Sequence, residues 1–291
     1  MKILVTGASG QLGAYLLDEL VRVGHEVVAW SGSKVDLRGG VDLVPVDLAA
    51  IDSIEPALDR ADPDAVIHAA AISSAEVVRL DRPRAEAINV RATRRISEWT
   101  KSRRRRVVFT STDLVFDGTR PLRREDDPAE PILAYGQTKR AAELALAPYQ
   151  STLVARLPLL FGLSRCGRPS FFDRAIEALR RGEPQSFFED EYRTPLDYGS
   201  AARGLVRLAS TDLAGIIHLA GRERMSRFDL MARSARALGL DAGLVRANRR
   251  SDASFPEPRP ADVSLDTTRW RTLFPDQTWL SVEEALRGIA G

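Results

Sequence analysis

A tyrosine and a lysine stand four residues apart in the run Tyr135-Gly136-Gln137-Thr138-Lys139. On a helix this spacing puts both side chains on one face. A free tyrosine has a pKa of about 10 and is a poor acid–base group at neutral pH, but a nearby ammonium stabilises the phenolate and lowers that pKa. The pair is therefore a candidate to deliver a proton to a substrate oxygen, with Tyr135 as the donor and Lys139 as the group that makes it acidic.

A hydroxyl that could act with this pair is Thr112, in Ser111-Thr112-Asp113. These residues directly follow an apolar run, 106–110, that reads as a buried strand. In an open α/β sheet that end of the strand is where ligands bind, so we expect Thr112 to face the same substrate carbonyl. The alternative is that the Thr112 hydroxyl only bonds its own backbone.

A glycine-rich turn, Thr6-Gly7-Ala8-Ser9-Gly10-Gln11-Leu12-Gly13, lies between a predicted strand and a predicted helix. The first glycine permits a tight turn, the second lets the backbone approach a pyrophosphate, and the third lets the helix pack against the sheet. The free N–H groups and the helix dipole then favour a phosphate at the helix N-terminus. A purely structural turn is the alternative. The turn residues predicted to bind the cofactor are Gly7, Ser9, Gly10, Gln11, Leu12 and Gly13.

The end of the second strand distinguishes NAD from NADP, because an acid there binds the ribose hydroxyl and a cation accepts a 2′-phosphate. This chain has no acid there before Asp36. Ser31 and Ser33 can donate hydrogen bonds, and Lys34 and Arg38 can neutralise a phosphate. We therefore predict NADPH as the preferred cofactor, with NAD as a possible substitute. Lys34 as an ordinary solvated loop residue is the alternative.

Further cofactor contacts are expected at the ends of the third and fourth strands. Asp47 could accept the adenine amino group or cap the next helix, and the two tasks are compatible. His68 is expected to be a packed, hydrogen-bonded histidine rather than a catalyst. The remaining residues predicted at the cofactor site are Leu48, Ala69, Ala70, Ala71, Asn89 and Pro158.

The elements that must position these residues alternate between strand-like and helix-like patterns. Such alternation indicates parallel βαβ units and a Rossmann-type doubly wound α/β sheet. The predicted strands are 2–6, 26–30, 43–46, 65–68, 106–110 and 152–156. The predicted helices between them are 12–23, 51–58, 84–100 and 134–147.

After about residue 157 the pattern changes, and prolines punctuate short elements. Helices are predicted at 170–181 and 200–209, and a strand at 215–219 could rejoin the sheet. We predict a Rossmann domain of residues 1–157 plus about 198–220, and a smaller, discontinuous substrate-binding lobe of about 158–197 and 221–291. A ligand crevice between two such lobes is a common arrangement.

Composition excludes several classes of protein. Among 291 residues there are 42 Lys+Arg against 40 Asp+Glu and a single cysteine, Cys166. The run 103–106 is four arginines, but it precedes a buried strand and has no interleaved aromatic residues, so no nucleic-acid partner is expected. With no disulfide framework and no stretch of roughly 20 apolar residues, we expect a cytoplasmic protein without a membrane partner.

Taken together, these motifs resemble the extended short-chain dehydrogenase/reductase family. The likeness rests on the glycine motif, Asp47, 68–71, Asn89, Thr112 and the Tyr135/Lys139 pair, which follow in the family's order. Within it, Ser-Thr-Asp-Leu-Val-Phe-Asp-Gly at 111–118 resembles the dTDP-4-dehydrorhamnose reductase and sugar-nucleotide-binding subfamily. Leu114 departs from that motif's Tyr. Tyr15 replaces a glutamate that helps some members bind magnesium at a dimer interface.

The resemblance implies that NADPH reduces the keto group of a nucleotide-linked 4-keto-6-deoxysugar, without a metal. Lys139 would also hold the nicotinamide ribose, and the chain would be a monomer or a homodimer. Residues expected at the substrate are Ser73, Thr112, Asp113 and, for the diphosphate, Arg193. Two alternatives remain open. One is an NAD-dependent sugar-nucleotide epimerase or dehydratase, and the other is a non-catalytic NADP-binding regulatory subunit similar to the methionine adenosyltransferase β-subunit.

Overall fold

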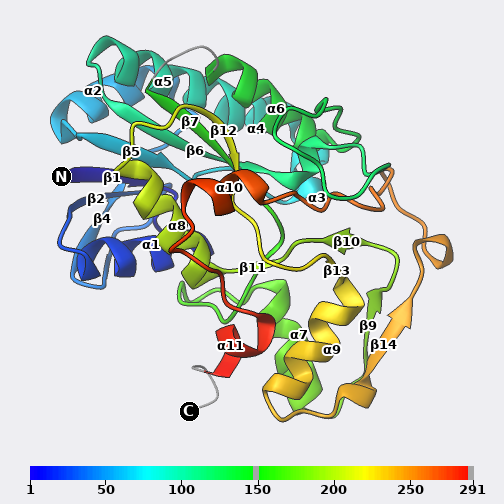
Figure 1. The fold of residues 1–291 in the computed structure, drawn as a ribbon. Helices are drawn as coiled ribbons and strands as arrows, with labels where there is room; N and C mark the ends of the chain where they lie inside the picture. Colours follow the sequence, from blue (N-terminus) through cyan, green and yellow to red (C-terminus); the bar gives the residue numbers. More distant parts are fainter. Residues whose placement is uncertain (147–150, 288–291) are drawn as a thin grey trace.

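The chain forms an α/β fold around one eight-stranded sheet, as a computed structural model shows for residues 1–146 and 151–287 (Figure 1). The strand order is β12-β7-β6-β5-β1-β2-β4-β3, and every neighbouring pair is parallel except β3 with β4. The strands are β1 (Lys2–Thr6), β2 (Glu26–Ser31), β3 (Asp36–Arg38), β4 (Val41–Pro45), β5 (Ala65–His68), β6 (Arg106–Thr112), β7 (Thr152–Leu157) and β12 (Gly215–His218). The predicted doubly wound fold is confirmed.

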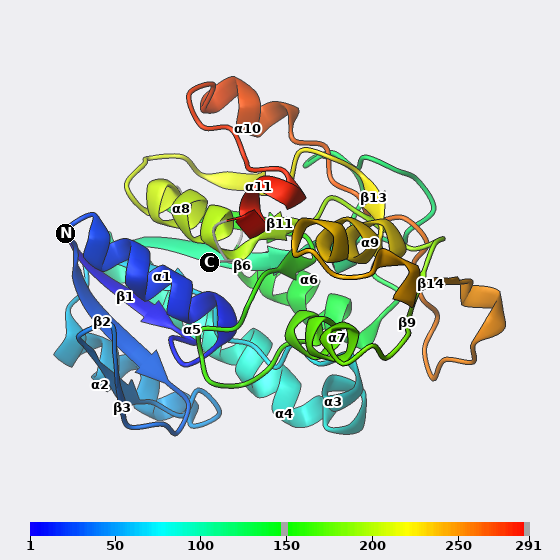
Figure 2. The ribbon, with the colours of Figure 1, turned by 90° about the horizontal axis from the view of Figure 1, so that it is seen from below.

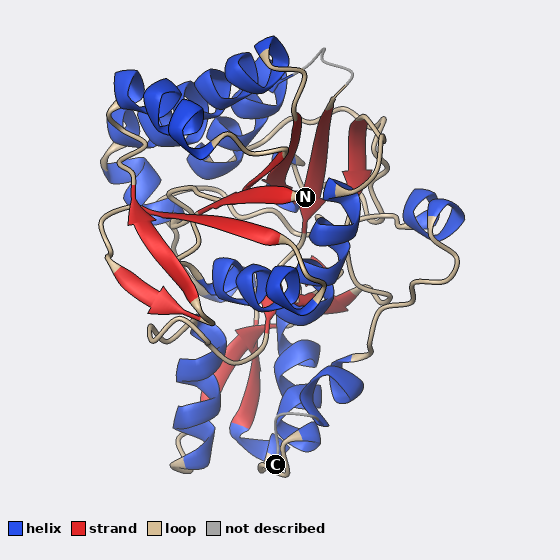
Figure 3. Cartoon of the chain, turned by 90° about the vertical axis from the view of Figure 1, so that its left-hand side faces the viewer, coloured by secondary structure: helices blue, strands red, loops and turns tan. Residues whose placement is uncertain are grey.

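The central strands are apolar along nearly their whole length because helices cover both faces of the sheet. All four residues of β5 and all six of β7 are buried. On one face lie α1 (Gln11–Arg22) and α8 (Tyr198–Ala209), which pack on each other through one core cluster. On the other face lie α2 (Ile51–Ala61), α5 (Ala92–Ser102) and α6 (Ala134–Leu146). Figure 3 shows these two helical layers on either side of the strands.

Every strand and helix predicted from the sequence is present, with ends that differ by a few residues. The predicted helix 134–147 agrees through Leu146, while residue 147 lies outside the described residues. Most of the elements after residue 157 were not predicted, nor were the edge strand β3 and the short helix α3 (Ala75–Leu80) in the first half of the chain. Both are short and largely exposed, so they carry little hydrophobic periodicity.

The predicted helix 84–100 is a composite. It consists of α4 (Arg82–Glu86), a π-helical turn (Ala87–Arg91) and α5. A π-helical turn is rare and often lies at a functional site. The buried Asn89 lies in it, and its amide reaches out of the helix to Ile72. The turn therefore aims one polar side chain at the loop that follows β5.

The C-terminal part of the chain returns to the sheet and also builds a smaller cluster below it (Figures 1 and 2). Strand β12 pairs with β7 and so rejoins the sheet, as expected for residues 215–219. Helix α8, which precedes β12 in the chain, covers one face of the sheet. The domain boundaries predicted from the sequence stay a prediction.

The other elements of the C-terminal part are β8 (Leu160–Phe161), α7 (Phe171–Arg180), β9 (Gln185–Phe188), β10 (Tyr192–Arg193), β11 (Leu196–Asp197), β13 (Met225–Ser226), α9 (Arg227–Ala237), β14 (Val245–Asn248), α10 (Thr268–Leu273) and α11 (Val282–Arg287).

Within the described ranges, no helix has the length and apolar character that a bilayer crossing requires.

Candidate active site

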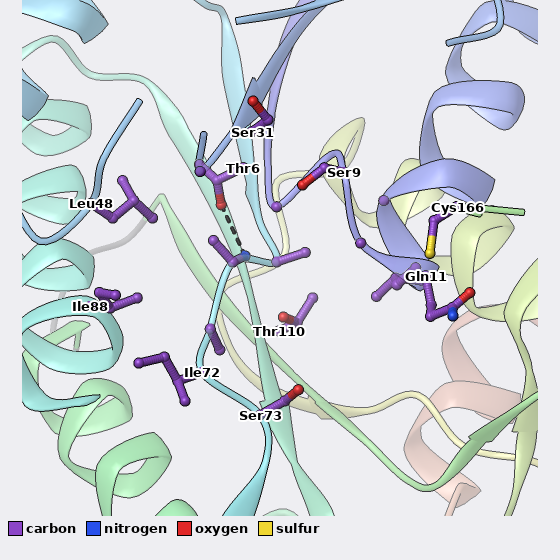
Figure 4. A pocket seen from close by; sticks show the side chains of 18 of the residues that line it. Thr6, Ser9, Gln11, Ser31, Leu48, Ile72, Ser73, Ile88, Thr110 and Cys166 are labelled. Atoms are coloured by element: carbon purple, nitrogen blue, oxygen red, sulfur yellow. Dashed lines mark hydrogen bonds between the residues drawn. The ribbon is translucent and has the colours of Figure 1, made fainter. Parts of the chain in front are cut away.

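A cleft of about 850 Å³ opens at the carboxyl ends of the parallel strands (Figure 4). It brings together residues that are far apart in the sequence, including the glycine turn and the Tyr135/Lys139 pair. The predicted site residues that line it are Gly7, Ser9, Gly10, Gln11, Leu12, Gly13, Ser31, Ser33, Asp47, Leu48, Ala69, Ala70, Ala71, Ser73, Thr112, Tyr135, Lys139 and Pro158.

The glycine turn leaves no room for side chains. Gly7 has a φ of +71°, and a Cβ there would lie 2.9 Å from the Cα of Ala70. A Cβ on Gly13 would lie 2.3 Å from the carbonyl oxygen of Gly7. Gly10 caps α1, and the first turn of that helix has no acidic residue to compete for its N–H groups. These features suit an anion held by backbone N–H groups at the helix N-terminus, as the pyrophosphate of a dinucleotide requires.

Helix α6 presents Tyr135 and Lys139 to the cleft from successive turns. The ammonium nitrogen of Lys139 lies 4.0 Å from the centroid of the Phe109 ring on β6. The N-terminal end of α6 can approach the turn that follows β6 closely because Gly136 faces the backbone of Leu114, where a Cβ would lie 2.1 Å from the carbonyl oxygen. The two elements that carry the candidate catalytic residues are thus in direct contact.

The pKa of Tyr135 differs from the sequence-based expectation. Burial raises the pKa of this phenol, and the negative charge of Asp113 raises it further. Burial also lowers the pKa of Lys139 to about 7, although Glu143 acts in the opposite direction. The expected lowering of the Tyr135 pKa by Lys139 is therefore not observed. The physical reason is that both groups lie in apolar surroundings, which favour their neutral forms.

The Thr112 hydroxyl lines the cleft and also bonds locally. It donates to Oδ1 of Asp113 at 3.2 Å and accepts from the backbone N–H of Leu114 at 3.2 Å. The local bond, which was the alternative interpretation, is therefore present in the structure. Since Thr112 also faces the cleft, the two roles are compatible in space.

His68 behaves as the sequence suggested, whereas Asp47 does not cap the next helix, because Ala50 is the N-cap residue of α2 and no side chain bonds there. Asp47 lines the cleft, and its carboxylate also accepts from the backbone N–H of Ala49 at 2.9 Å. The His68 ring lies between two hydroxyls, at 2.7 Å from Thr6 and 2.8 Å from Thr93. Burial lowers the pKa of His68 to about 3, with the charge of Lys139 as a second cause. The packed, hydrogen-bonded histidine is confirmed.

Five residues predicted at the site are not among those that line the cleft, namely Lys34, Arg38, Asn89, Asp113 and Arg193. Lys34 is exposed beyond the end of β2. Asn89 is buried and hydrogen-bonds the backbone of Ile72 and the hydroxyl of Thr138. It therefore joins the loop after β5 to α6 rather than facing a ligand. Asp113 and Arg193 form a buried ion pair, with Nε of Arg193 lying 3.3 Å from Oδ2 of Asp113.

Several residues that line the cleft were not predicted from the sequence. Two of them are cations, Arg84 on α4 and Arg168 in the loop after β8. Arg84 and Ile88 stand four residues apart, a spacing that puts both side chains on one helical face. No local pattern marks Arg168. The other lining residues missed are Thr6, Trp30, Gly32, Val46, Ile72, Ile88, Thr110, Ser111, Leu157, Leu160, Cys166, Pro169, Ser170 and Tyr198.

A doubly wound sheet with a glycine turn and a polar cleft at its strand ends defines a dinucleotide-binding protein of the extended short-chain dehydrogenase/reductase type. Comparison with known families places the chain more narrowly. The profile described as RmlD substrate binding domain matches residues 1–288, and the chain belongs to that family.

Relatives span nearly the whole chain. It is 31% identical over 287 residues to a Streptomyces antibioticus protein named probable dTDP-4,6-dihydroxy-2-methyloxan-3-one 4-ketoreductase, covering 97% of this chain and 92% of the relative. It is 25% identical over 280 residues to methionine adenosyltransferase 2 subunit beta of Bos taurus, covering 94% and 82%.

Among solved structures, dTDP-4-dehydrorhamnose reductase from Bacillus anthracis in complex with NADP superposes with a TM-score of 0.86 at 22% identity, covering 99% of this chain and 97% of the other. This likeness confirms the fold.

Proposed function

We propose that this chain is an NADPH-dependent reductase that acts on the keto group of a nucleotide-linked 4-keto-6-deoxysugar. The observation that carries the proposal is that Thr112, Tyr135 and Lys139 line the same cleft as the glycine turn. The ketoreductase name of the Streptomyces antibioticus relative supports the reaction class. The cleft would hold the keto group of the substrate against the reduced nicotinamide of the cofactor.

The cleft fits a dinucleotide. The glycine positions clear a path for the backbone to approach a pyrophosphate, and the N-terminus of α1 favours its charge. Ser31 and Ser33 line the cleft at the end of β2, where a 2′-phosphate would be bound, and no acid stands beside them. This supports NADPH as the preferred cofactor, with NAD able to bind.

NADPH supplies a hydride when bound. The residues of this chain supply position and a proton. Tyr135 is protonated at neutral pH, as a tyrosine ordinarily is, so it can give a proton to the alkoxide that forms on reduction. Thr112 would orient the carbonyl oxygen by turning its one hydroxyl proton from Asp113 to the substrate. Lys139, on the same helical face, holds the cofactor's ribose and adds positive charge when protonated.

The substrate would enter beside Ser73, and Asp113 with its partner Arg193 would form the wall behind Thr112. We retain Arg193 as a candidate for the substrate diphosphate, since a guanidinium binds phosphate with two parallel hydrogen bonds. That role requires its ion pair with Asp113 to be shared with the ligand. We further propose that the protein works in the cytoplasm as a monomer or a homodimer.

The test is a panel of dTDP-linked 4-keto sugars assayed by the loss of NADPH absorbance, with Tyr135→Phe as the control variant. We expect turnover of at least one sugar. General acid–base catalysis contributes about 10²- to 10⁴-fold, so the variant should lose activity by that factor while it still binds NADPH. Unchanged activity in the Tyr135→Phe variant would eliminate this proton donor.

A second candidate function is a non-catalytic NADP-binding subunit, which the match to methionine adenosyltransferase 2 subunit beta favours. It predicts NADP binding without turnover of any keto sugar in the same panel. An NAD-dependent epimerase or dehydratase would instead purify with NAD bound and would not consume NADPH. The absorbance assay and the nucleotide content of the purified protein distinguish the three.

A further inference from the structure

A segment of the C-terminal half, residues 163–169, crosses over the glycine turn, and we call it the strap. It follows β8 and leads into α7. The Tyr15 hydroxyl on α1 donates to the carbonyl oxygen of Leu163 at 2.7 Å. At the other end of the strap, Nε2 of Gln11 donates to the carbonyl oxygen of Arg168. Figure 4 shows Gln11 and Cys166 next to each other at the start of α1.

The strap has a defined internal structure. Ser164 is held in place by two hydrogen bonds. Its backbone N–H donates to Asp173 at 2.8 Å, and its hydroxyl donates to the carbonyl oxygen of Arg168 at 2.8 Å. Gly167 has a φ of +71°, a left-handed conformation that turns the chain back toward α1. This turn sets the direction of the next residue, Arg168.

The guanidinium of Arg168 lies at the glycine turn. Its Nη2 donates to the carbonyl oxygen of Ser9 at 3.0 Å, one residue before Gly10, which caps α1. Arg168 lines the cleft but is otherwise exposed. One hydrogen bond to a neutral carbonyl uses only a part of the five donors of a guanidinium. The remaining donors stand where the N-terminus of α1 already favours an anion.

The other charged side chains that line the cleft are not at this turn. They are Asp47 after β4, Arg84 on α4 and Lys139 on α6. Arg38, on β3, donates to the carbonyl oxygens of Ala8 and Cys166 at 3.5 and 3.4 Å, but it is not among the lining residues. Arg168 is therefore the one lining cation, among the described residues, that is hydrogen-bonded to the glycine turn.

We propose that Arg168 binds the pyrophosphate of the dinucleotide, so that the strap supplies a cation to the glycine turn at the N-terminus of α1. This inference rests on the proposed function, because it takes a dinucleotide as the ligand. Guanidinium and phosphate form charge-assisted, two-pronged hydrogen bonds, which a backbone N–H group alone does not. The role is binding and positioning, since Arg168 does not contact the reacting atoms.

The experiment measures dissociation constants by titration calorimetry for NADP⁺, NAD⁺ and 2′-AMP, with Arg168→Gln compared with the unchanged chain. We expect Arg168→Gln to weaken NADP⁺ and NAD⁺ binding by the same factor, about 10- to 100-fold, the range for losing a hydrogen bond to a charged group. Binding of 2′-AMP, which lacks the pyrophosphate, should be unchanged. Arg168→Lys, which keeps the charge, should recover part of the loss.

The matched control is Arg165→Gln in the same strap. The Arg165 guanidinium pairs with Asp18 on α1 at 2.8 Å and lies over the ring of Tyr15. It anchors the strap without lining the cleft. We expect its loss to change dinucleotide affinity less than about twofold, with circular dichroism confirming that both variants fold.

Three outcomes would overturn the proposal. They are an unchanged affinity in Arg168→Gln, a loss confined to NADP⁺ and 2′-AMP, or an equal loss in Arg165→Gln, which would mean that strap packing matters rather than charge. If the unchanged chain bound neither dinucleotide, the proposed function would fail and this inference with it. Binding by the unchanged chain separates the two failures.

Discussion

Two titratable residues of the cleft, Tyr135 and Lys139, have pKa values that move toward their neutral forms. A reductase needs its proton donor protonated before the reaction, and Tyr135 meets this condition at neutral pH. Burial and the charge of Asp113 raise the pKa of this phenol, which makes it a weaker acid than a free tyrosine.

Lys139 gives a prediction about stability and pH. Burial lowers its pKa to about 7 in the folded chain, while an unfolded lysine has a pKa of about 10.4. Between these values the unfolded chain binds a proton that the folded chain does not, so the free energy of unfolding should rise as the pH rises from about 7 to 10. In Lys139→Met this rise should be reduced. Urea unfolding across that pH range measures it.

The control for that experiment is Lys34→Met, because Lys34 is exposed. Its pH dependence should match that of the unchanged chain. Above about pH 10 the raised pKa of Tyr135 acts with the opposite sign, so the comparison stays below that value. If the difference in free energy of unfolding between Lys139→Met and the unchanged chain did not vary with pH, the lowered pKa of Lys139 would be contradicted.

At the level of residues, the sequence was informative where chemistry depends on short spacing. The glycine turn and the Tyr135/Lys139 pair were recognisable because the residues of each motif stand within seven positions of one another in the chain. Arg168 was not, because its position depends on the path of the strap rather than on its neighbours in the chain. The raised pKa of Tyr135 also escaped prediction, since it depends on burial and on the distant Asp113.

At the level of elements, a buried ion pair joins α6 to β7. Glu143 accepts from Nε and Nη2 of Arg156, each at 2.9 Å, and from the Ser111 hydroxyl at 2.6 Å. Glu143 and Arg156 are 2% and 1% exposed. Although burial alone would raise the pKa of Glu143, the hydrogen bonds from Arg156 hold it below its usual value. The helix that carries Tyr135 is thus fixed to the sheet by charge as well as by packing.

We predict that Glu143→Gln destabilises the fold by about 3–5 kcal/mol, because it leaves the Arg156 charge buried without a countercharge. The matched control is Glu86→Gln, which removes the exposed pair with Arg82 on α4 and should cost no more than about 1 kcal/mol. Chemical denaturation of both variants measures the two values. Equal effects would show that the pair under α6 contributes no more than a surface pair.

The order and type of the main elements could be read from the sequence because buried strands and amphipathic helices have strong periodicity. The strand β3 and the helix α3 could not, because few of their side chains are buried. The π-helical turn around Asn89 also escaped prediction. Its Asn89 is hydrogen-bonded to Ile72 and Thr138, partners that no local pattern encodes.

At the level of the whole molecule, the two halves of the chain share one core. Leu16 of α1, Leu205 of α8 and Trp270 of α10 belong to the same buried cluster. A core shared in this way couples the unfolding of distant segments. The dinucleotide-binding part and the end of the chain should therefore lose structure together.

This coupling predicts a single unfolding transition. In pulsed hydrogen exchange at increasing urea, peptides that cover β1 and peptides that cover α10 should become unprotected in the same fraction of molecules. Leu205→Ala should shift both to lower urea by the same amount, since deleting a buried leucine side chain costs about 2–5 kcal/mol. Separate midpoints for the two sets of peptides would show that the halves unfold independently.

The late position of α8 and β12 also has a consequence during translation. The apolar face of α1 emerges from the ribosome early, but α8, which covers it, begins only at Tyr198, and β12 begins at Gly215. For most of its synthesis the nascent chain therefore exposes Leu16, Leu17 and Leu20 together with one open edge of the sheet. We expect a chain built in this order to need protection from aggregation until its last third has been made.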